Sequence, residues 1–282
     1  MKLPNLIVGG APKSGTSSLY FWLSEHPDIF ASKVKETFFF NDKINKFNIN
    51  CNCIQHNIHE YSKFFAGSKN QKIIFEATAA YIYSNNALKN LSEFCDPPKI
   101  IFLLREPSQQ IYSHYKMENF RTKRVNESFS IYSKRDVIIN RANYYHYLKN
   151  WYNLYPKEKI KLILYEDLIK NKKEVLFNIC DFLEIDKKYF ENFDFQHRNK
   201  SIKIKSKKLH NLSQKIQPLV PHKIQKLILP IYLKFNSSND VINLSTNDKK
   251  ILDELKKNFN FLRSKLSILD PNLDFSYWDW IL

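Results

Sequence analysis

The stretch LIVGGAPKSGTSSLYFWL, from Leu6 to Leu23, decides how the fold begins. It runs from an apolar segment of strand length, through a turn that contains glycine and proline, into a segment with helical spacing. A strand, turn and helix in this order present backbone N–H groups and the positive end of a helix dipole to an anion. The stretch therefore predicts an anion-binding loop, and its individual residues must decide which anion it binds.

Further apolar runs of strand length alternate with helical patterns along the chain. The runs are KIIFEA from Lys72, KIIFLL from Lys99 and IKLILY from Ile160, and helical spacing appears at residues 16–23, 108–119, 144–154 and 172–183. Strands that are apolar on both faces and separated by helices are typical of a parallel sheet covered by helices. We therefore expect an α/β fold with a P-loop-like parallel sheet flanked by helices.

The C-terminal part has a different character. We expect one domain over residues 1–282, with a core of about 1–198 and a mainly helical, basic extension of about 199–282. Residues 199–235 are rich in lysine and interrupted by Pro218, Pro221 and Pro230, which predicts loops and short helices against the main domain. A last helix is expected to start near STND, residues 245–248, and to continue through residue 266.

Composition limits the functional classes. Lys and Arg total 44 against 28 Asp and Glu, a net charge of +16, which favours anionic ligands, acidic polymers or peripheral contact with anionic membranes. An evenly basic surface without function is the alternative. Four cysteines are too few for a disulfide scaffold, so free thiols in a reducing compartment are expected. Without a signal peptide or an apolar span of about 18 residues, the chain is predicted to be soluble, cytoplasmic and bacterial.

The first loop differs from that of nucleoside triphosphatases. Their motif is G-x-x-x-x-G-K-[ST], and Gly10 and Gly15 supply its glycines, but Thr16 stands where the lysine should be. The lysine here is Lys13, and the run IIFLL ends in Arg105 rather than in an aspartate for magnesium. These differences argue against ATP hydrolysis.

Residues 12–18, PKSGTSS, resemble the 5′-phosphosulfate loop of sulfotransferases that use 3′-phosphoadenosine 5′-phosphosulfate (PAPS). The run IIFLLREPSQQIYSHYKM resembles the 3′-phosphate motif of this family, with an arginine at a strand end and a serine eight residues later. Pro107 suits a first helical turn, so Arg105 and Ser113 can reach one phosphate. The donor-binding residues that the resemblance implies are Lys13, Ser14, Gly15, Thr16, Ser17, Ser18, Arg105 and Ser113.

The segment KETFFFN, residues 35–41, resembles the K-E-x-x-F-F segment of carbohydrate sulfotransferases, especially the heparan sulfate N- and 3-O-sulfotransferase branch. The resemblance implies that Glu36 is the catalytic base and that Lys13 assists catalysis. It places Lys35, Phe38 and Asn41 beside the acceptor. The alternative is a buried FFF run with an exposed Lys35–Glu36 pair.

The resemblance covers nearly the whole chain, with one departure. The segments YYHYLKNWYNLYPKEKIKLILYEDL and LDPNLDFSYW also match the family, and Arg198 and Lys200 are candidates for the loop over the 3′-phosphate. Ala77 stands where many relatives have a lysine, which leaves the acceptor open. Glu166 and Asp167 are competing carboxylates, but their place after a late strand suits bracing the next helix.

One other group of residues is a candidate metal site. Cys51, Cys53, His56 and His59 lie in CNCIQHNIHEY, where they could bind zinc. The spacing is tight for four ligands, so a polar loop is favoured, and the sulfotransferase resemblance implies no metal.

The sequence thus predicts transfer of a sulfuryl group from PAPS to a hydroxyl or amino group of an acceptor, most simply a carbohydrate, with adenosine 3′,5′-bisphosphate as product. No nucleic-acid partner is expected. A P-loop nucleotide kinase and a non-catalytic protein that binds acidic polymers are the alternatives.

Overall fold

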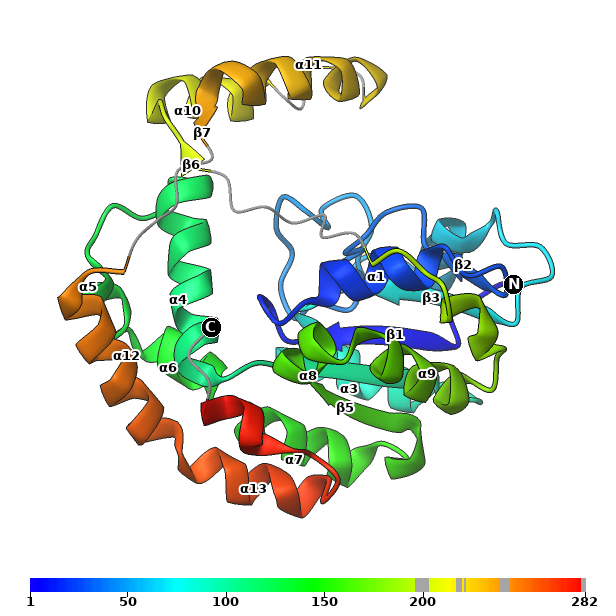
Figure 1. The fold of residues 1–282 in the computed structure, drawn as a ribbon. Helices are drawn as coiled ribbons and strands as arrows, with labels where there is room; N and C mark the ends of the chain where they lie inside the picture. Colours follow the sequence, from blue (N-terminus) through cyan, green and yellow to red (C-terminus); the bar gives the residue numbers. More distant parts are fainter. Residues whose placement is uncertain (196–202, 217–219, 221, 239–243, 280–282) are drawn as a thin grey trace.

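A five-stranded parallel sheet forms the centre of the computed structural model, which describes all residues except 196–202, 217–219, 221, 239–243 and 280–282 (Figure 1). The strand order is β2-β3-β1-β4-β5, and each neighbouring pair is parallel. The strands are β1 (Leu6–Gly10), β2 (Ile29–Ala31), β3 (Ile73–Ala77), β4 (Lys99–Leu104) and β5 (Ile160–Leu164). The four predicted strands are confirmed, and β2 was missed because it is only three residues long.

Successive strand residues face opposite sides of the sheet, as the pleat requires. Leu6 and Val8 pack into the core on one side, whereas Ile7 packs into the core on the other. The first core is covered by α1 (Thr16–Ser24), α8 (Tyr165–Lys170) and α9 (Lys172–Leu183). The continuous apolar strands are therefore explained by burial on both faces.

Helices from the middle and the end of the chain form the second core. They are α3 (Asn85–Ser92), α4 (Pro107–Lys116), α7 (Tyr144–Leu154), α12 (Thr246–Phe259) and α13 (Phe261–Leu269). Trp151 on α7 is fully buried against Phe102 of β4, with ring centroids 5.1 Å apart. Its indole N–H donates to the carbonyl of Ile82 at 3.2 Å, so the polar end of the ring is satisfied as well.

Short elements connect these layers. The α-helical ones are α2 (Ile58–Ser62), α5 (Phe129–Tyr132) and α6 (Asp136–Ala142). The 3₁₀ turns are η1 (Lys63–Phe65), η2 (Tyr81–Tyr83), η4 (Lys157–Lys159), η5 (Lys187–Phe190) and η7 (Phe275–Asp279), and η3 (Met117–Arg121) is a π-helical turn that continues α4.

The predicted last helix starts where expected but is divided in two. Ser245 and Asp248 form a reciprocal capping box at the start of α12, which confirms that prediction. The helix ends at Phe259, and α13 begins at Phe261. The division follows from packing, because α12 lies against α4 whereas α13 lies against α7.

The expectation of short helices packed against the main domain was wrong for residues 199–235. The structure has two longer helices there, α10 (Lys207–Ile216) and α11 (His222–Asn236), and Pro230 falls within α11. They stand apart from the sheet in Figure 1 and are reached through the antiparallel strands β6 (Lys203–Ile204) and β7 (Ser237–Ser238). Within the described parts of the chain, no helix has both the length and the apolar character to cross a membrane.

Candidate functional site

The predicted anion-binding residues meet at the carboxyl ends of β1 and β4. These strands are neighbours, but the chain visits β2 and β3 between them, so the sheet order reverses at this point. Ligands of open α/β sheets bind at such a position. Lys13 follows β1 and Arg105 follows β4, and the Nη1 group of Arg105 lies 3.4 Å from the carbonyl oxygen of Lys13. The structure therefore brings together two motifs that are far apart along the chain.

The loop between β1 and α1 has a backbone that requires its glycine. Gly15 has φ 89°, and a Cβ atom there would lie 2.9 Å from the ring of Tyr165. Lys13 also has a positive φ of 70°, a strained conformation of the kind that is concentrated at functional sites. The strain is explained if the loop is shaped around a ligand rather than for its own stability.

The start of α1 supplies donors for an anion. Thr16, Ser17 and Ser18 form its first turn, where backbone N–H groups have no carbonyl partner within the helix. This turn contains no acidic residue that would compete with an anionic ligand. Ser14, just before the helix, is fully buried. The positive end of the helix dipole adds to the attraction.

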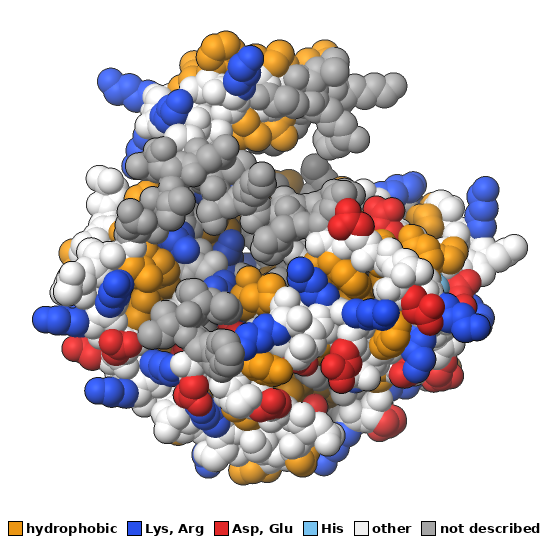
Figure 2. Space-filling model, viewed as in Figure 1, with side chains coloured by type: hydrophobic (Ala, Val, Ile, Leu, Met, Phe, Trp, Pro, Cys, Tyr) orange, Lys and Arg blue, Asp and Glu red, His pale blue; other side chains and the backbone are white. Residues whose placement is uncertain are grey.

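Lys13 lies in a strongly positive environment. Burial, together with the positive charges of Arg121, Arg105 and Lys116, lowers the pKa of Lys13 to about 8, whereas Glu36 opposes this shift. Figure 2 shows Lys and Arg side chains in the hollow between the α4 side of the molecule and the sheet. A cluster of cations around a buried lysine is unfavourable unless an anion binds among them.

Arg105 is held in place but keeps a free donor. Its guanidinium lies over the ring of Tyr165, with Cζ 4.5 Å from the ring centroid. Its Nε is buried and has no hydrogen-bond partner among the residues that the structure describes. An unpaired buried donor is costly, and a ligand phosphate would satisfy it.

Ser113 lies on α4, as predicted. Pro107 is at the first position of this helix, which confirms that part of the prediction. Ser113 is partly exposed and lies one turn before Lys116, so the two share a face of the helix. Lys116 and Arg121 were missed by sequence analysis, because surface lysines and arginines are common and no motif marks these two.

Glu166 braces α4 rather than its own helix. It is buried, and its Oε1 accepts the backbone N–H of Glu106 at 3.0 Å. Burial raises the pKa of Glu166 above its ordinary value. The Glu106 side chain in turn accepts the N–H groups of Ser108 and Gln109 at the helix start. Both carboxylates therefore fix the segment that carries Arg105.

Glu36 is presented by a second strained loop. Glu36 has φ 64° and Phe38 has φ 52°. The Glu36 N–H donates to the carbonyl of Ala77 at 2.9 Å, which ties the loop to the end of β3. The Nζ of Lys35 lies 2.8 Å from Oε1 of Glu36, and the two side chains are 19% and 32% exposed. The pair is thus partly buried, and Glu36 acts electrostatically on Lys13.

The other two residues expected at the acceptor lie in the same loop. Phe38 is partly exposed, and its ring centroid lies 5.5 Å from that of Phe47. Asn41 is also partly exposed, and its N–H donates to the carbonyl of Phe38 at 3.2 Å. By contrast, Phe39 and Phe40 are buried in the core. The run FFF therefore anchors the loop while its first phenylalanine stays accessible.

A buried carboxylate that sequence analysis missed holds this loop. Glu76 on β3 is fully buried and accepts four hydroxyl groups, from Thr37, Tyr61, Thr78 and Tyr81. Thr37 directly follows Glu36, and its Oγ1 is 2.7 Å from Oε2 of Glu76. The sequence does contain a signal for this role: a single glutamate within an apolar strand needs hydrogen-bond donors around it once it is buried.

We predict that Glu76→Gln destabilises the protein by about 2 kcal/mol or more, because hydrogen bonds to a buried charged group are lost and an amide N–H₂ faces hydroxyl donors. Urea unfolding of the variant would measure this loss. Glu60→Gln is the matched control, since Glu60 only pairs with Lys63 on the surface at 2.6 Å. Equal stability of Glu76→Gln and the wild type would contradict the role of Glu76.

Ala77 lies beside the Glu36 loop, whereas the other remaining sequence candidates lie apart from this cluster or outside the described residues. Ala77 is fully buried at the end of β3, so no cationic side chain occupies the position of the frequent family lysine. Arg198 and Lys200 fall outside the described residues. Cys51 and Cys53 are free thiols, and among the described residues no three His, Cys, Asp or Glu side chains come together that could hold a metal ion.

A family model described as the sulfotransferase domain matches residues 3–227. The chain belongs to this family. It is 36% identical over 116 residues to the membrane-associated sulfotransferase kil1 of Dictyostelium discoideum, covering 40% of this chain and 22% of that protein. It is also 31% identical over 133 residues to the human bifunctional heparan sulfate N-deacetylase/N-sulfotransferase 3, covering 46% of this chain and 15% of that protein. The match therefore spans a minor part of these relatives.

A solved sulfotransferase structure has the same fold. A crystal structure of a sulfotransferase from Alicyclobacillus acidocaldarius superposes with a TM-score of 0.61 at 23% identity, covering 81% of this chain and 96% of that chain. The similarity shows that the parallel sheet and flanking helices of this sulfotransferase domain are those of the family fold.

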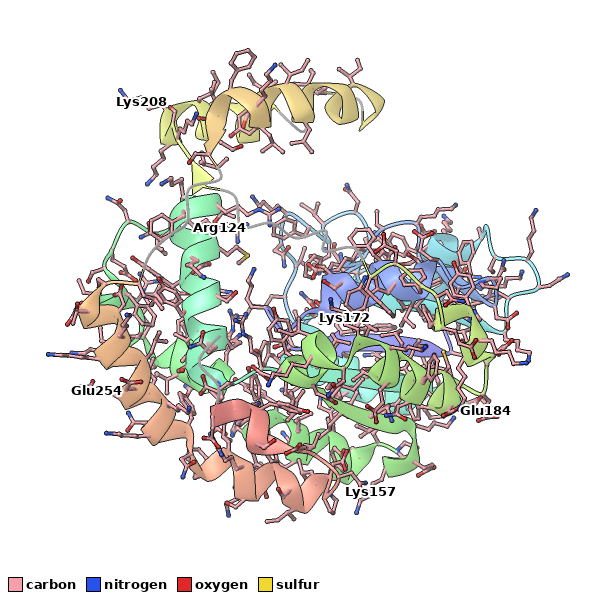
Figure 3. All side chains as sticks on the ribbon, viewed as in Figure 1. Arg124, Lys157, Lys172, Glu184, Lys208 and Glu254 are labelled. Carbon is pink, nitrogen blue, oxygen red and sulfur yellow. The ribbon has the colours of Figure 1, made fainter. Side chains whose placement is uncertain are left out.

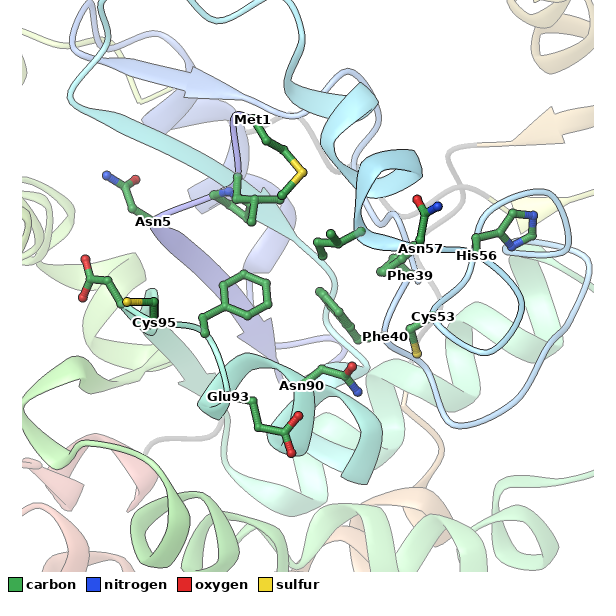
Figure 4. A pocket seen from close by; sticks show the side chains of 15 residues that line it. Met1, Asn5, Phe39, Phe40, Cys53, His56, Asn57, Asn90, Glu93 and Cys95 are labelled. Carbon is green, nitrogen blue, oxygen red and sulfur yellow. The ribbon is translucent and has the colours of Figure 1, made fainter.

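The sulfotransferase domain also has a separate pocket of about 680 Å³ near the N-terminus (Figure 4). It is bordered by Met1 and Asn5 before β1, by Phe40, and by Glu93 and Asp96 after α3. The described residues that line it include no Lys or Arg. Such a lining does not suit an anionic ligand, in contrast to the positive environment of Lys13.

Proposed function

We propose that this protein transfers a sulfuryl group from PAPS to a hydroxyl or amino group of a carbohydrate acceptor. The observation that carries the proposal is the convergence of the Lys13 loop and the Arg105 segment at one edge of the sheet, in a chain of the sulfotransferase domain family. Two anion-binding motifs, with Lys116 and Arg121 beside them, suit a donor that carries a phosphosulfate at one end and a 3′-phosphate at the other.

Two groups of residues bind the two ends of the donor. Lys13 and the N–H groups from Ser14 to Ser18 bind the 5′-phosphosulfate, and Arg105 with Ser113 binds the 3′-phosphate. The buried Nε of Arg105 fits this role, because no described residue accepts a hydrogen bond from it.

The reaction is an in-line substitution at sulfur. The acceptor oxygen or nitrogen forms a bond to sulfur, while the bond from sulfur to the bridging oxygen breaks. The acceptor proton passes to Glu36, and the negative charge that develops on the 5′-phosphate is stabilised by Lys13 and the loop N–H groups. The Nζ of Lys35, 2.8 Å from Oε1 of Glu36, holds the carboxylate in position.

A carbohydrate acceptor is supported by the KETFFFN segment and by the names of relatives. Besides the human protein above, mouse carbohydrate sulfotransferase 15 is 24% identical over 247 residues, covering 65% of this chain and 44% of that protein. Lys35, Phe38 and Asn41 lie in the loop of Glu36 and are placed to contact the sugar. A phenylalanine there offers an apolar face on which a sugar ring can pack.

Binding of adenosine 3′,5′-bisphosphate tests the proposal without knowledge of the acceptor. A ligand at 100 times its Kd stabilises a protein by about 2.7 kcal/mol, so its melting temperature should rise by several degrees. ATP with magnesium should give a much smaller shift. A larger shift with ATP and magnesium would favour a nucleotide kinase, and no shift with either would favour a non-catalytic binder of acidic polymers.

Arg105→Ala is expected to weaken donor binding far more than it slows the bound chemistry, because the 3′-phosphate is remote from the sulfur. Loss of a charge-assisted bidentate contact should cost about 2 to 3 kcal/mol. Calorimetry with adenosine 3′,5′-bisphosphate measures this, and Arg135→Ala, which removes an exposed arginine paired with Glu127, is the control. Unchanged affinity in Arg105→Ala would remove this residue from the donor site.

Donor affinity is expected to fall as pH rises above about 8. The pKa of Lys13 in the free protein is lowered to about 8 by burial, so above this pH the anion must bind together with a proton. The affinity for adenosine 3′,5′-bisphosphate should then fall by up to about tenfold per pH unit. Lys13→Arg keeps its charge and should give a much flatter profile between pH 7 and 10. Parallel profiles for the two proteins would contradict this assignment.

A further inference from the structure

Two helices in the C-terminal part of the chain expose apolar side chains along their length. We call residues 203–238, from β6 through α10 and α11 to β7, the arm. Eight of its described apolar side chains are 44% to 72% exposed; they are Leu209, Leu212, Ile216, Ile224, Ile228, Leu229, Ile231 and Phe235. Figure 2 shows hydrophobic atoms along the arm, where it stands apart from the rest of the molecule.

These side chains follow helical spacing. On α10 they occur at Leu209, three residues later and again four residues later, and on α11 they recur from Ile224 at intervals of four, three and four residues. This spacing forms an apolar stripe along each helix. In a globular protein such a stripe is normally buried, so its exposure indicates an interaction surface.

The arm and its flanks also carry an unusual charge. From Phe195 to Asn239 the sequence contains ten of the 44 Lys and Arg residues and none of the 28 Asp and Glu residues. The positive charge is therefore concentrated here rather than spread evenly. Lys205, Lys207, Lys208 and Lys234 are exposed, and Figure 3 shows Lys208 at the outer part of the arm.

We propose that the arm docks the protein onto an anionic lipid membrane, with its apolar stripes in the headgroup layer and its lysines beside lipid phosphates. Amphipathic helices with apolar stripes and abundant lysine bind membrane surfaces in this way, at about 1 kcal/mol per basic residue. A second copy of the arm is a poor partner, because two such segments repel each other and neither offers a carboxylate.

Docking through the arm would orient the donor site. The arm is anchored where β6 packs against η3, the π-helical turn at the end of α4. Arg121 of this turn is among the charges that lower the pKa of Lys13. The membrane-facing arm and the donor site are thus attached to the same short segment, although docking itself does not depend on the proposed reaction.

Vesicle flotation of the full chain tests this proposal. We expect binding to vesicles of equal parts phosphatidylglycerol and phosphatidylcholine, at least about tenfold weaker binding to pure phosphatidylcholine, and a loss of binding as salt is raised. Failure to float with the anionic vesicles at about 0.1 M salt would overturn the proposal.

Two pairs of matched variants separate the arm from general surface effects. Ile228→Asp with Ile231→Asp should reduce vesicle binding at least about tenfold, whereas Leu154→Asp with Ile268→Asp, at exposed positions elsewhere, should not. Lys207→Glu with Lys208→Glu should likewise reduce binding, whereas Lys249→Glu with Lys250→Glu on α12 should have a clearly smaller effect. Equal losses in an arm pair and its control would overturn the proposal.

Folding and self-association are checked on the same variants. The thermal shift with adenosine 3′,5′-bisphosphate should be retained in the arm variants, so that lost vesicle binding is not a sign of an unfolded core. Sedimentation velocity without lipid should show a monomer. A dimer that Ile228→Asp with Ile231→Asp dissociates, without vesicle binding by the wild type, would assign the arm to a second copy instead.

Discussion

Replacement of Glu36 by glutamine is expected to lower the rate of sulfate transfer by a factor of about 10² to 10⁴ while donor affinity is retained. Hydroxyl groups of sugars are very weak acids, so their attack on sulfur at neutral pH needs a base that takes the proton. The glutamine amide keeps the shape of Glu36 but cannot accept a proton. The backbone of residue 36 is held by Ala77, so the loop should keep its position in the variant.

Glu166→Gln is the control for this experiment. Glu166 is a buried glutamate near the segment that carries Arg105, and its Oε1 accepts the Glu106 N–H. A glutamine oxygen can accept the same hydrogen bond, so transfer should fall much less than in Glu36→Gln. Both variants are measured for adenosine 3′,5′-bisphosphate affinity and for transfer to the same acceptor. If Glu36→Gln transfers sulfate at the wild-type rate, the base lies elsewhere.

The central fold could be predicted because its strands are buried on both faces. In the run KIIFLL every position after Lys99 is apolar, and the structure places these residues in two different cores. The starts of two helices could also be predicted. Pro107 at the start of α4, and the capping pair Ser245 and Asp248 at the start of α12, depend only on residues close to them in the sequence. Local chemistry is visible in sequence because its partners are only a few residues apart.

Features that depend on distant partners could not be predicted. Glu76 is explained only by four hydroxyl groups that reach it from 2 to 39 residues away. The contribution of Lys116 and Arg121 to the site can be recognised only once the structure shows that their charges act on Lys13. The position of the arm was predicted wrongly for a related reason. Its apolar spacing resembles that of a buried helix, and the spacing alone does not show which surface covers the apolar side chains.

The second large effect is expected for Lys13→Ala, which should lower turnover at saturating donor by at least about a hundredfold. The bond that breaks leaves negative charge on the bridging oxygen, and under the proposed mechanism we expect Lys13 to stabilise this charge more strongly than it stabilises the bound donor. Ground-state affinity should also fall, so both quantities must be measured. Lys43→Ala, at an exposed position, is the control and should keep both.

Lys13→Met distinguishes a functional loss from misfolding. Burial lowers the pKa of Lys13 from 10.5 to about 8, so below pH 8 the ligand-free protein bears the full cost of holding this charge. As pH rises from about 8 to 10.5, the folded protein releases the proton first and the cost disappears. Methionine, of similar size and without charge, should therefore raise the melting temperature of the ligand-free protein at pH 7, and this increase should disappear toward pH 10.

A Lys13→Met variant that is more stable than the wild type at pH 7 and yet has lost turnover would show that the charge of Lys13 serves catalysis rather than stability. Turnover near the wild-type level with saturating donor, in either Lys13→Met or Lys13→Ala, would contradict the assignment of the loop.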